Sequence, residues 1–359
     1  MESVECPVDK TDDEIEEAIH ALISKHPILK GRIDDKHSTV LLICDSYPLI
    51  ESTDSTDCST LMKPFDLNKY LARFFIVDNK YSKSIVYDVH HIINDAVGFS
   101  IINNDLTTAI EGDLNRSTDL GFLHANHDSF ESKFEAEYES AHRFYRKMFK
   151  DIEDAGSIAL DENGTGGIVS LPIRGIKNDV DEFCRNNNIT VGIFLNGIFA
   201  RAYSHFIKSS KVCYNFVEHG RHDDYAHDSL GMFARTTPVL VDCGYDNIKD
   251  YLDYFSDLTL NSMFNNVYPY RLLEKEFGLN NTVLFEYNFD LNDVSDIEDD
   301  ITVKENCKDE FADFFTIVND LDDGYVIHVR HTEMFSDDTA IHFVRLYAEI
   351  LTRTVKGKY

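Results

Sequence analysis

The chain has 359 residues, of which 43% are hydrophobic and 27% are charged, and its formal net charge at pH 7 is −30. Such a surface repels phosphate backbones and anionic lipids, which argues against nucleic acid or an anionic membrane as partner. No apolar run has the length of a membrane span, and the polar, acidic start is not a signal peptide. The seven scattered cysteines form no C-x-x-C pair, which predicts reduced thiols and a cytoplasmic protein.

Helical and extended patterns alternate along the first half of the chain. Thr11 and Glu14 form a capping-box pattern ahead of a helix with one apolar face, which Pro27 ends. Further expected elements are strands at 38–44, 71–78 and 84–91, a helix at 96–112 and a long amphipathic helix at 129–152. We expect two lobes, at residues 1–155 and 156–359, with the glycine-rich loop DENGTGG near their boundary.

The second half continues the mixture of strands and helices, which predicts an α/β fold with α+β character. The segment TVGIFLNGIFARAYSHFI is apolar on nearly all sides and predicts a buried helix. Ser336 is expected to cap the last helix, and the acidic stretch at 290–300 is expected to be a solvated loop. The other expected elements are strands at 168–173, 211–218, 281–289, 310–320 and 325–335, and helices at 176–188 and 336–355.

The stretch VHHIINDA is the strongest candidate for a functional motif. Histidine exchanges a proton near neutral pH, so a histidine at the end of a strand can act as a general base toward a bound substrate. Asp95 can fix the loop by accepting hydrogen bonds or by pairing with an arginine. A purely structural role for His90 and His91 is the alternative, and a metal site is disfavoured because adjacent residues of a strand point to opposite faces.

The segment HHIINDAVGFS resembles the His-His-x-x-x-Asp-Gly signature of condensation domains of non-ribosomal peptide synthetases, whose fold is related to chloramphenicol acetyltransferase. Other segments resemble the same family in the same order along nearly the whole chain. They are ALISKHPILKGRI, PFDLNKYLARFFIVD, FYRKMF, TVGIFLNGIFARAYSHFI, VEHGRHDDYAHDSLGMFARTTPVLVD, PYRLLEKEFG and NTVLFEYNF.

This resemblance implies two acetyltransferase-like lobes that form a V-shaped pseudo-dimer around a tunnel. Donor and acceptor carrier proteins would present acyl and aminoacyl thioesters on phosphopantetheine arms, and the acceptor amine would attack the donor carbonyl to form an amide. A neighbouring adenylation domain is an implied partner if the chain is part of a synthetase. No tightly bound cofactor and no metal is implied; coenzyme A is the alternative acyl carrier.

The resemblance also assigns roles to individual residues. His91 is the expected catalytic residue, as a base or as a positioning group, and His90 is its structural neighbour. Asp95 is expected to form a salt bridge with Arg221, and Ala96 stands where the signature has glycine. The remaining candidates, expected to line the tunnel, are Lys30, Gly231, Phe233, Arg235 and Tyr287.

Several departures from the family pattern leave alternatives open. The family's opening strand and helix have no counterpart before the first expected helix, so an N-terminal element is expected to be missing. A stand-alone acyltransferase, an epimerisation domain and a non-catalytic docking module are the alternatives. Epimerisation is disfavoured because Val217, and not Glu218, occupies the position of the glutamate that epimerisation domains carry. Two basic clusters are interpreted first as ordinary surface charge, with carrier docking as the alternative: Arg143, Arg146 and Lys147, and Arg201, Lys208 and Lys211.

Overall fold

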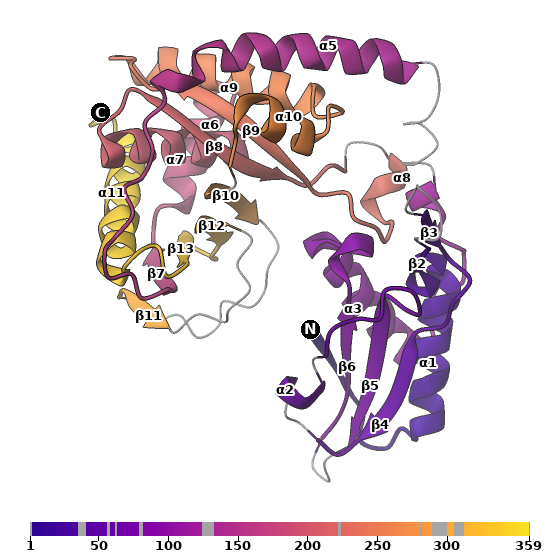
Figure 1. The fold of residues 1–359 in the computed structure, drawn as a ribbon. Coiled ribbons are helices and arrows are strands. Elements are labelled where there is room, and N and C mark those ends of the chain that lie inside the picture. Colours follow the sequence, from indigo (N-terminus) through magenta and orange to yellow (C-terminus); the bar gives the residue numbers. More distant parts are fainter. Residues whose placement is uncertain are drawn as a thin grey trace. The chain divides into compact units, whose positions relative to one another are not determined.

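The computed structural model divides into two compact units (Figure 1). Unit 1 comprises residues 1–132 and 219–234, and unit 2 comprises residues 133–218 and 235–359. We call residues 219–234 the strap, because they follow a strand of unit 2 in sequence and pack within unit 1. The predicted lobe boundary at 155/156 stays a prediction. The structure describes residues 2–34, 41–55, 58–61, 63–78, 82–123, 133–221, 224–280, 282–288, 300–304 and 312–358.

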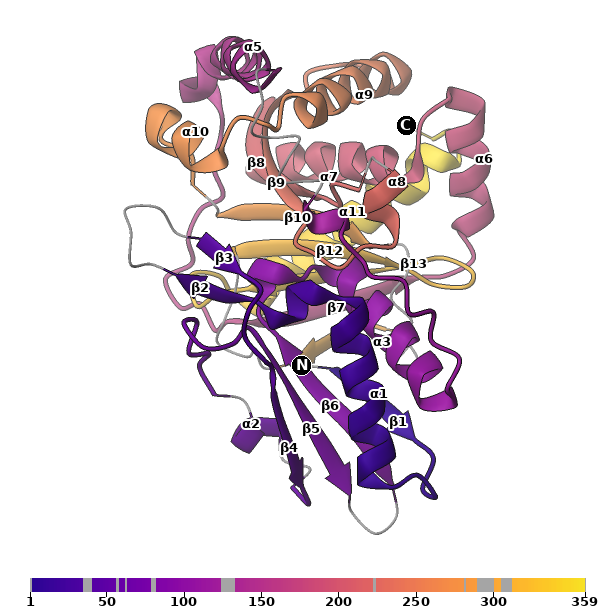
Figure 2. The ribbon, with the colours of Figure 1, turned by 90° about the vertical axis from the view of Figure 1, so that its right-hand side faces the viewer.

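Unit 1 is built on a four-stranded sheet in the order β1-β6-β5-β4. Helices α1 (Asp12–Lys25) and α3 (Ala96–Glu111) pack against the apolar face of this sheet and complete the core (Figure 2). The sheet strands are β1 (Glu2–Cys6), β4 (Leu49–Thr53), β5 (Ala72–Asp78) and β6 (Lys83–Val89). The shorter elements are η1 (Pro27–Lys30), β2 (Arg32–Asp34), β3 (Leu41–Ile43), α2 (Cys58–Leu61), η2 (His91–Ile93) and, in the strap, α8 (Asp224–His227).

The start of the chain differs from the sequence prediction. β1 precedes α1 and pairs antiparallel with β6, from Glu2 opposite Tyr87 to Cys6 opposite Lys83. The expectation that no strand precedes the first helix was therefore wrong, and β6 has a pairing partner on each side. The predicted capping box of α1 is confirmed: the Glu14 backbone N–H donates to the Thr11 hydroxyl over 3.2 Å, and the Thr11 N–H donates to the Glu14 carboxylate over 2.8 Å.

Unit 2 contains a seven-stranded mixed sheet in the order β11-β7-β13-β12-β10-β8-β9. Its strands are β7 (Gly167–Ile173), β8 (Lys211–Glu218), β9 (Arg235–Asp242), β10 (Val283–Asn288), β11 (Thr302–Lys304), β12 (Phe314–Asp320) and β13 (Tyr325–His331). The helices are α5 (Lys133–Met148), η3 (Phe149–Asp154), α6 (Lys177–Asn187), α7 (Val191–Ile207), α9 (Ile248–Phe264), α10 (Tyr270–Phe277) and α11 (Asp337–Val355).

The helices of unit 2 cover both faces of its sheet. Helices α6, α7, α9 and α11 bury one face in the main core, and α7 is buried along most of its length, as its sequence predicted. On the other face, α5 and α10 form a smaller apolar cluster over β8 and β9. The acidic stretch that was predicted to be a loop lies, apart from Asp300, outside the described residues.

Two general expectations can be compared with the described part of the chain. Cysteines 6, 44, 184, 213 and 243 are free thiols. Among the described helices, none combines the length and the apolar character that a membrane crossing requires.

Candidate active site

The two adjacent histidines lie just beyond the end of β6, in different environments. The half-buried His90 ring accepts a hydrogen bond from the Ile92 backbone N–H over 3.1 Å and meets the Phe65 ring edge-on at 5.5 Å. Burial lowers the pKa of His90, and the neighbouring His91 adds to this effect. The His91 side chain is exposed. His90 is therefore held by its neighbours, and the exposed His91 side chain is accessible to a ligand.

Asp95 fixes the loop that follows His91. Its side chain is 2% exposed, and each carboxylate oxygen accepts two hydrogen bonds. Oδ1 accepts from the Gly98 N–H over 2.9 Å, which caps α3, and from Arg221 Nη2 over 2.7 Å. Oδ2 accepts from the N–H groups of Phe233 and Ala234 over 3.0 and 3.2 Å. Since ionised carboxylates accept about four hydrogen bonds, Asp95 is fully satisfied.

Arg221 organises the strap from the inside. Its guanidinium is buried, and Nη1 donates to the carbonyl oxygens of Ala226 and Ser229, the latter over 2.7 Å. The guanidinium carbon also lies 4.4 Å from the centre of the Phe233 ring. Together with the ion pair to Asp95, which the sequence led us to expect, these contacts join both ends of the strap to the loop after His91.

Small residues allow this close packing. Gly220 has φ +64°, and a Cβ atom there would lie 1.9 Å from the Phe233 carbonyl oxygen. A Cβ at Gly98 would lie 1.9 Å from Asn94 Oδ1. Ala96, which replaces the glycine of the family signature, is the first residue of α3 and is not among the described non-glycine residues with positive φ. Alanine therefore fits this position without backbone strain.

The other candidate residues are distributed over both units. Gly231 and Phe233 belong to the strap, where the Gly231 carbonyl accepts from Arg221 over 3.5 Å. Lys30 lies in η1 with its ammonium 5.3 Å from the centre of the Tyr47 ring. Arg235 and Tyr287 belong to unit 2.

Tyr287 lies on the face of the unit 2 sheet that helices α6, α7, α9 and α11 bury in the main core. Its ring packs against the main core beside Gly192, and its hydroxyl donates to Asp320 over 2.9 Å. Burial raises the pKa of Tyr287, and the Asp320 carboxylate adds to the rise. These contacts are those of a core tyrosine with a polar end.

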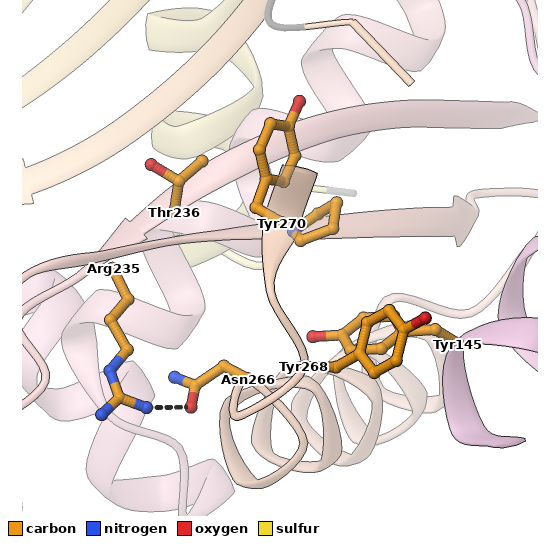
Figure 3. Close-up of a pocket in the computed structure, with 7 residues that line it drawn as sticks. Tyr145, Arg235, Thr236, Asn266, Tyr268 and Tyr270 are labelled. Carbon is orange, nitrogen blue, oxygen red and sulfur yellow. Dashed lines mark hydrogen bonds between the residues drawn. The ribbon is translucent and has the colours of Figure 1, made fainter. Parts of the chain in front are cut away.

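Arg235 lines a pocket of about 320 Å³ at the start of β9 (Figure 3). Its Nη1 donates to Asn266 Oδ1 over 2.7 Å, and Asn266 Nδ2 donates to the buried Glu218 carboxylate over 2.6 Å. Three tyrosines make the pocket wall aromatic. The lining residues are Tyr145, Arg235, Thr236, Pro238, Asn266, Tyr268 and Tyr270. This pocket combines a cation with flat apolar surfaces.

Val217 and Glu218 lie on opposite faces of β8, as expected from their adjacent positions. Val217 packs against an apolar cluster that includes Leu284, Phe315 and Ile317. Glu218 is on the face that carries the hydrogen bond to Asn266. The Glu218 carboxylate therefore lies on the opposite face of β8 from the Val217 side chain.

The second basic cluster is not a surface patch. Arg201 is buried in α7, donates to the Tyr245 carbonyl over 3.1 Å and lies 5.2 Å from the centre of the Tyr251 ring. Lys211 is paired with Asp154 over 2.7 Å. The surface placement that both interpretations of this cluster assumed for Arg201 was wrong, because the apolar periodicity of α7 buries it.

Solved structures with this fold identify its class. The chain superposes over 99% of its length on holo-AB3403, a four domain nonribosomal peptide synthetase, with a TM-score of 0.76 and 14% identity, and it covers 31% of that chain. It superposes equally completely on the condensation domain of the Monacolin K polyketide synthase MokA, with a TM-score of 0.74 and 12% identity, and covers 91% of that chain. The architecture is therefore the mixed α/β, chloramphenicol-acetyltransferase-like fold of condensation domains.

Sequence comparison agrees with the fold. The model of the family "Condensation domain" matches residues 4–355, so the chain belongs to the condensation-domain family. It is similar to Nonribosomal peptide synthetase 8 of Aspergillus fumigatus, with 23% identity over 76% of this chain and 3% of the relative. It is also similar to Surfactin synthase subunit 1 of Bacillus subtilis, with 21% identity over 92% of this chain and 10% of the relative. The chain spans a tenth or less of the length of these curated relatives.

Proposed function

We propose that the chain catalyses amide formation between a donor acyl thioester and an acceptor aminoacyl amine, both carried on phosphopantetheine arms. The observation that carries this proposal is the exposed His91 side chain at the end of β6, followed by a loop that the buried Asp95 clamps. A rigid support of this kind favours reactions in which a base or hydrogen-bonding group must hold a fixed position.

The proposed reaction transfers one acyl group. The amine nitrogen attacks the thioester carbon, the C–S bond then breaks, and the proton lost by the nitrogen replaces the acyl group on the departing sulfur. His91 either removes this proton or positions the amine through a hydrogen bond. In either role its ring must reach the nitrogen, so truncation to alanine removes the contribution.

The partners follow from the same chemistry. Carrier-protein domains deliver the two thioesters, and an adenylation domain loads the acceptor carrier.

Arg235 supports the assignment of carrier proteins as partners. It makes one hydrogen bond to a neutral amide and, within the described ranges, no salt bridge. Its guanidinium can pair with the phosphodiester of a pantetheine arm, since arginine binds phosphate through parallel hydrogen bonds. Substituting Arg235 with alanine should raise KM for the loaded carrier and leave kcat nearly unchanged, whereas Arg353→Ala on the exposed side of α11 should change neither.

A single-turnover assay tests the proposal. Loaded donor and acceptor carrier proteins are mixed with the wild type, with His91→Ala or with His91→Gln, and amide product is measured. His20→Ala is the matched control, because His20 is an exposed histidine on α1. The wild type and the control should form product at equal rates, and His91→Ala should be slower by roughly a hundredfold or more.

The glutamine variant separates the two roles of His91. It retains a hydrogen-bonding group without a basic nitrogen, so partial activity supports positioning and the alanine rate supports general-base catalysis. Product from coenzyme A donors without carrier proteins would replace the proposal with a stand-alone acyltransferase. Absence of product with every donor, from a folded protein, would replace it with a non-catalytic docking module.

A further inference from the structure

A second ionic cluster in unit 1 lies outside the histidine motif. His26, at the end of α1, is fully buried between two carboxylates. Its Nε2 lies 2.6 Å from Asp105 Oδ2 of α3, and its Nδ1 lies 2.8 Å from Asp119 Oδ2, which follows α3 in the chain. Lys25 completes the cluster through its ammonium, 2.7 Å from Asp105.

This geometry requires a protonated ring. Ionised carboxylates only accept hydrogen bonds, so both ring nitrogens must donate, and only the imidazolium has two N–H groups. Burial works to lower the pKa of His26, but the hydrogen bonds with Asp105 and Asp119 outweigh it and raise the pKa above the usual value. The same contacts lower the pKa values of Asp105 and Asp119 against the effect of burial.

Asp119 connects this cluster to the strap. Its Oδ2 accepts from His26 and from the Leu230 N–H over 2.8 Å. Its Oδ1 accepts from the Ser229 hydroxyl and from the Gly121 N–H over 3.0 Å. Like Asp95, Asp119 therefore accepts four hydrogen bonds. Asp119 holds the strap at residues 229–230, and the buried Asp95 holds it at residues 221 and 233–234.

We infer that His26 is a positioning residue whose proton controls how firmly the strap, and through it the Asp95 loop beside His91, is held. A neutral imidazole has a single N–H, so one of the two carboxylates would face a lone pair at hydrogen-bond distance. The charged groups facing His26 are Asp105 and Asp119, with Lys25 behind Asp105. Deprotonation changes the summed charge of this buried cluster from zero to minus one, which favours release of Asp119 and the strap.

The direction of the pH dependence follows from the raised pKa. The stabilisation is fully present below the ordinary histidine pKa of about 6.5. It is lost as the pH rises through the higher pKa of the folded state. The strap should therefore be firmly held in mildly acidic solution and loosen in alkaline solution.

Hydrogen–deuterium exchange of the whole chain tests this inference. Exchange at strap residues 224–234 is followed from about pH 5.5 to about pH 9, with rates corrected for intrinsic chemical exchange. The wild-type protection factor should fall by about tenfold or more across this range. Residues 340–351 of α11, in unit 2, are the internal reference and should not show this transition.

Three variants sharpen the test. His26→Gln should abolish the transition, and His20→Gln, on the same helix, should retain it. Asp105→Asn removes one of the two carboxylates that favour the imidazolium, so the midpoint should move to lower pH. This shift remains measurable if His26→Gln fails to fold. A wild-type protection factor that is constant over the range, or an unchanged midpoint in Asp105→Asn, would overturn the inference.

The effect on catalysis rests on the proposed function and has a separate readout. In the amide assay, kcat/KM should decline at high pH with the midpoint of the exchange transition, and that midpoint should move in Asp105→Asn. If the chain forms no amide, the proposed function fails while the exchange midpoint still decides the role of His26. If amide forms but its pH profile does not follow the exchange midpoint, the positioning role fails while the proposed function stands.

Discussion

Replacing Asp95 with alanine tests the clamp behind the candidate active site. The substitution removes the acceptor of the Arg221 guanidinium and of three backbone N–H groups, at Gly98, Phe233 and Ala234. Both side chains of the ion pair are almost fully buried, at 3% and 2% exposure, so water cannot readily replace the lost contacts. The perturbation therefore leaves a buried positive charge and uncaps α3.

The expected loss of stability is large. Removing one partner of a buried ion pair costs about 3–5 kcal/mol, chiefly because the other charge stays buried. Removing the side chain that caps a helix N-terminus typically costs about 1 kcal/mol, which is the size expected for α3. These contributions overlap at one carboxylate and do not add, so we expect a decrease of about 4 kcal/mol in the free energy of unfolding. The total free energy of unfolding of a domain is only about 5–15 kcal/mol, so the variant should be marginally stable.

Urea unfolding of the wild type and variants measures this decrease. Asp45→Ala is the matched control, because Asp45 binds Arg32 through two hydrogen bonds at the surface, with its own side chain 55% exposed. The Asp45→Ala substitution should lower the free energy of unfolding by about 1 kcal/mol or less. The double variant Asp95→Ala/Arg221→Met removes both buried charges and should be more stable than the single Asp95→Ala variant.

Two outcomes would refute this reasoning. One is an Asp95→Ala protein whose free energy of unfolding lies within about 1 kcal/mol of the wild type, as expected for an exposed pair. The other is a double variant that is no more stable than Asp95→Ala, since this would show that the residual charge of Arg221 is not the source of the loss.

Three further predictions concern two glycines of unit 1 and a histidine of unit 2. Gly98→Ala places a Cβ 1.9 Å from Asn94 Oδ1 and should lower the free energy of unfolding by about 1–3 kcal/mol; adding Asn94→Ala should restore most of this loss. Gly121→Ala places a Cβ 1.9 Å from the Ser229 hydroxyl, so hydrogen exchange of the strap should accelerate while that of α11 is unchanged. Burial and two nearby cations lower the pKa of His328 to about 4. In the unfolded chain a histidine binds a proton at about pH 6.5, so the free energy of unfolding of the wild type should fall by up to about 3 kcal/mol between about pH 7 and about pH 4. Urea unfolding at a series of pH values should show a smaller decrease for His328→Gln.

Local patterns in the sequence predicted the regular elements well. The capping box at Thr11 and the apolar positions that follow define α1, and the apolar segment after Thr190 defines α7. These signals come from neighbours in the chain, which the sequence displays directly. β1 carries no such signal: its five residues become a strand by pairing with β6, about 80 residues later in the chain. α9 was not among the predicted elements.

The candidate site was predictable in part. The motif pointed to His91 and Asp95, and the resemblance to condensation domains suggested Arg221 as the partner of Asp95. The strap could not be recognised, since it depends on contacts between Asp119 and Ser229 and between Asp95 and Arg221, which are 110 and 126 residues apart. His26 was part of a segment that resembled the family, but its two carboxylate partners come from residues 79 and 93 positions away.

The most direct measurement of the central claim is the amount of amide formed in one turnover by carrier-bound donor and acceptor on the wild type and on His91→Ala. We predict product from the wild type and a rate lower by roughly two orders of magnitude or more from a folded His91→Ala protein. Equal rates for the two proteins would contradict the assignment of His91 as the group that acts on the attacking amine.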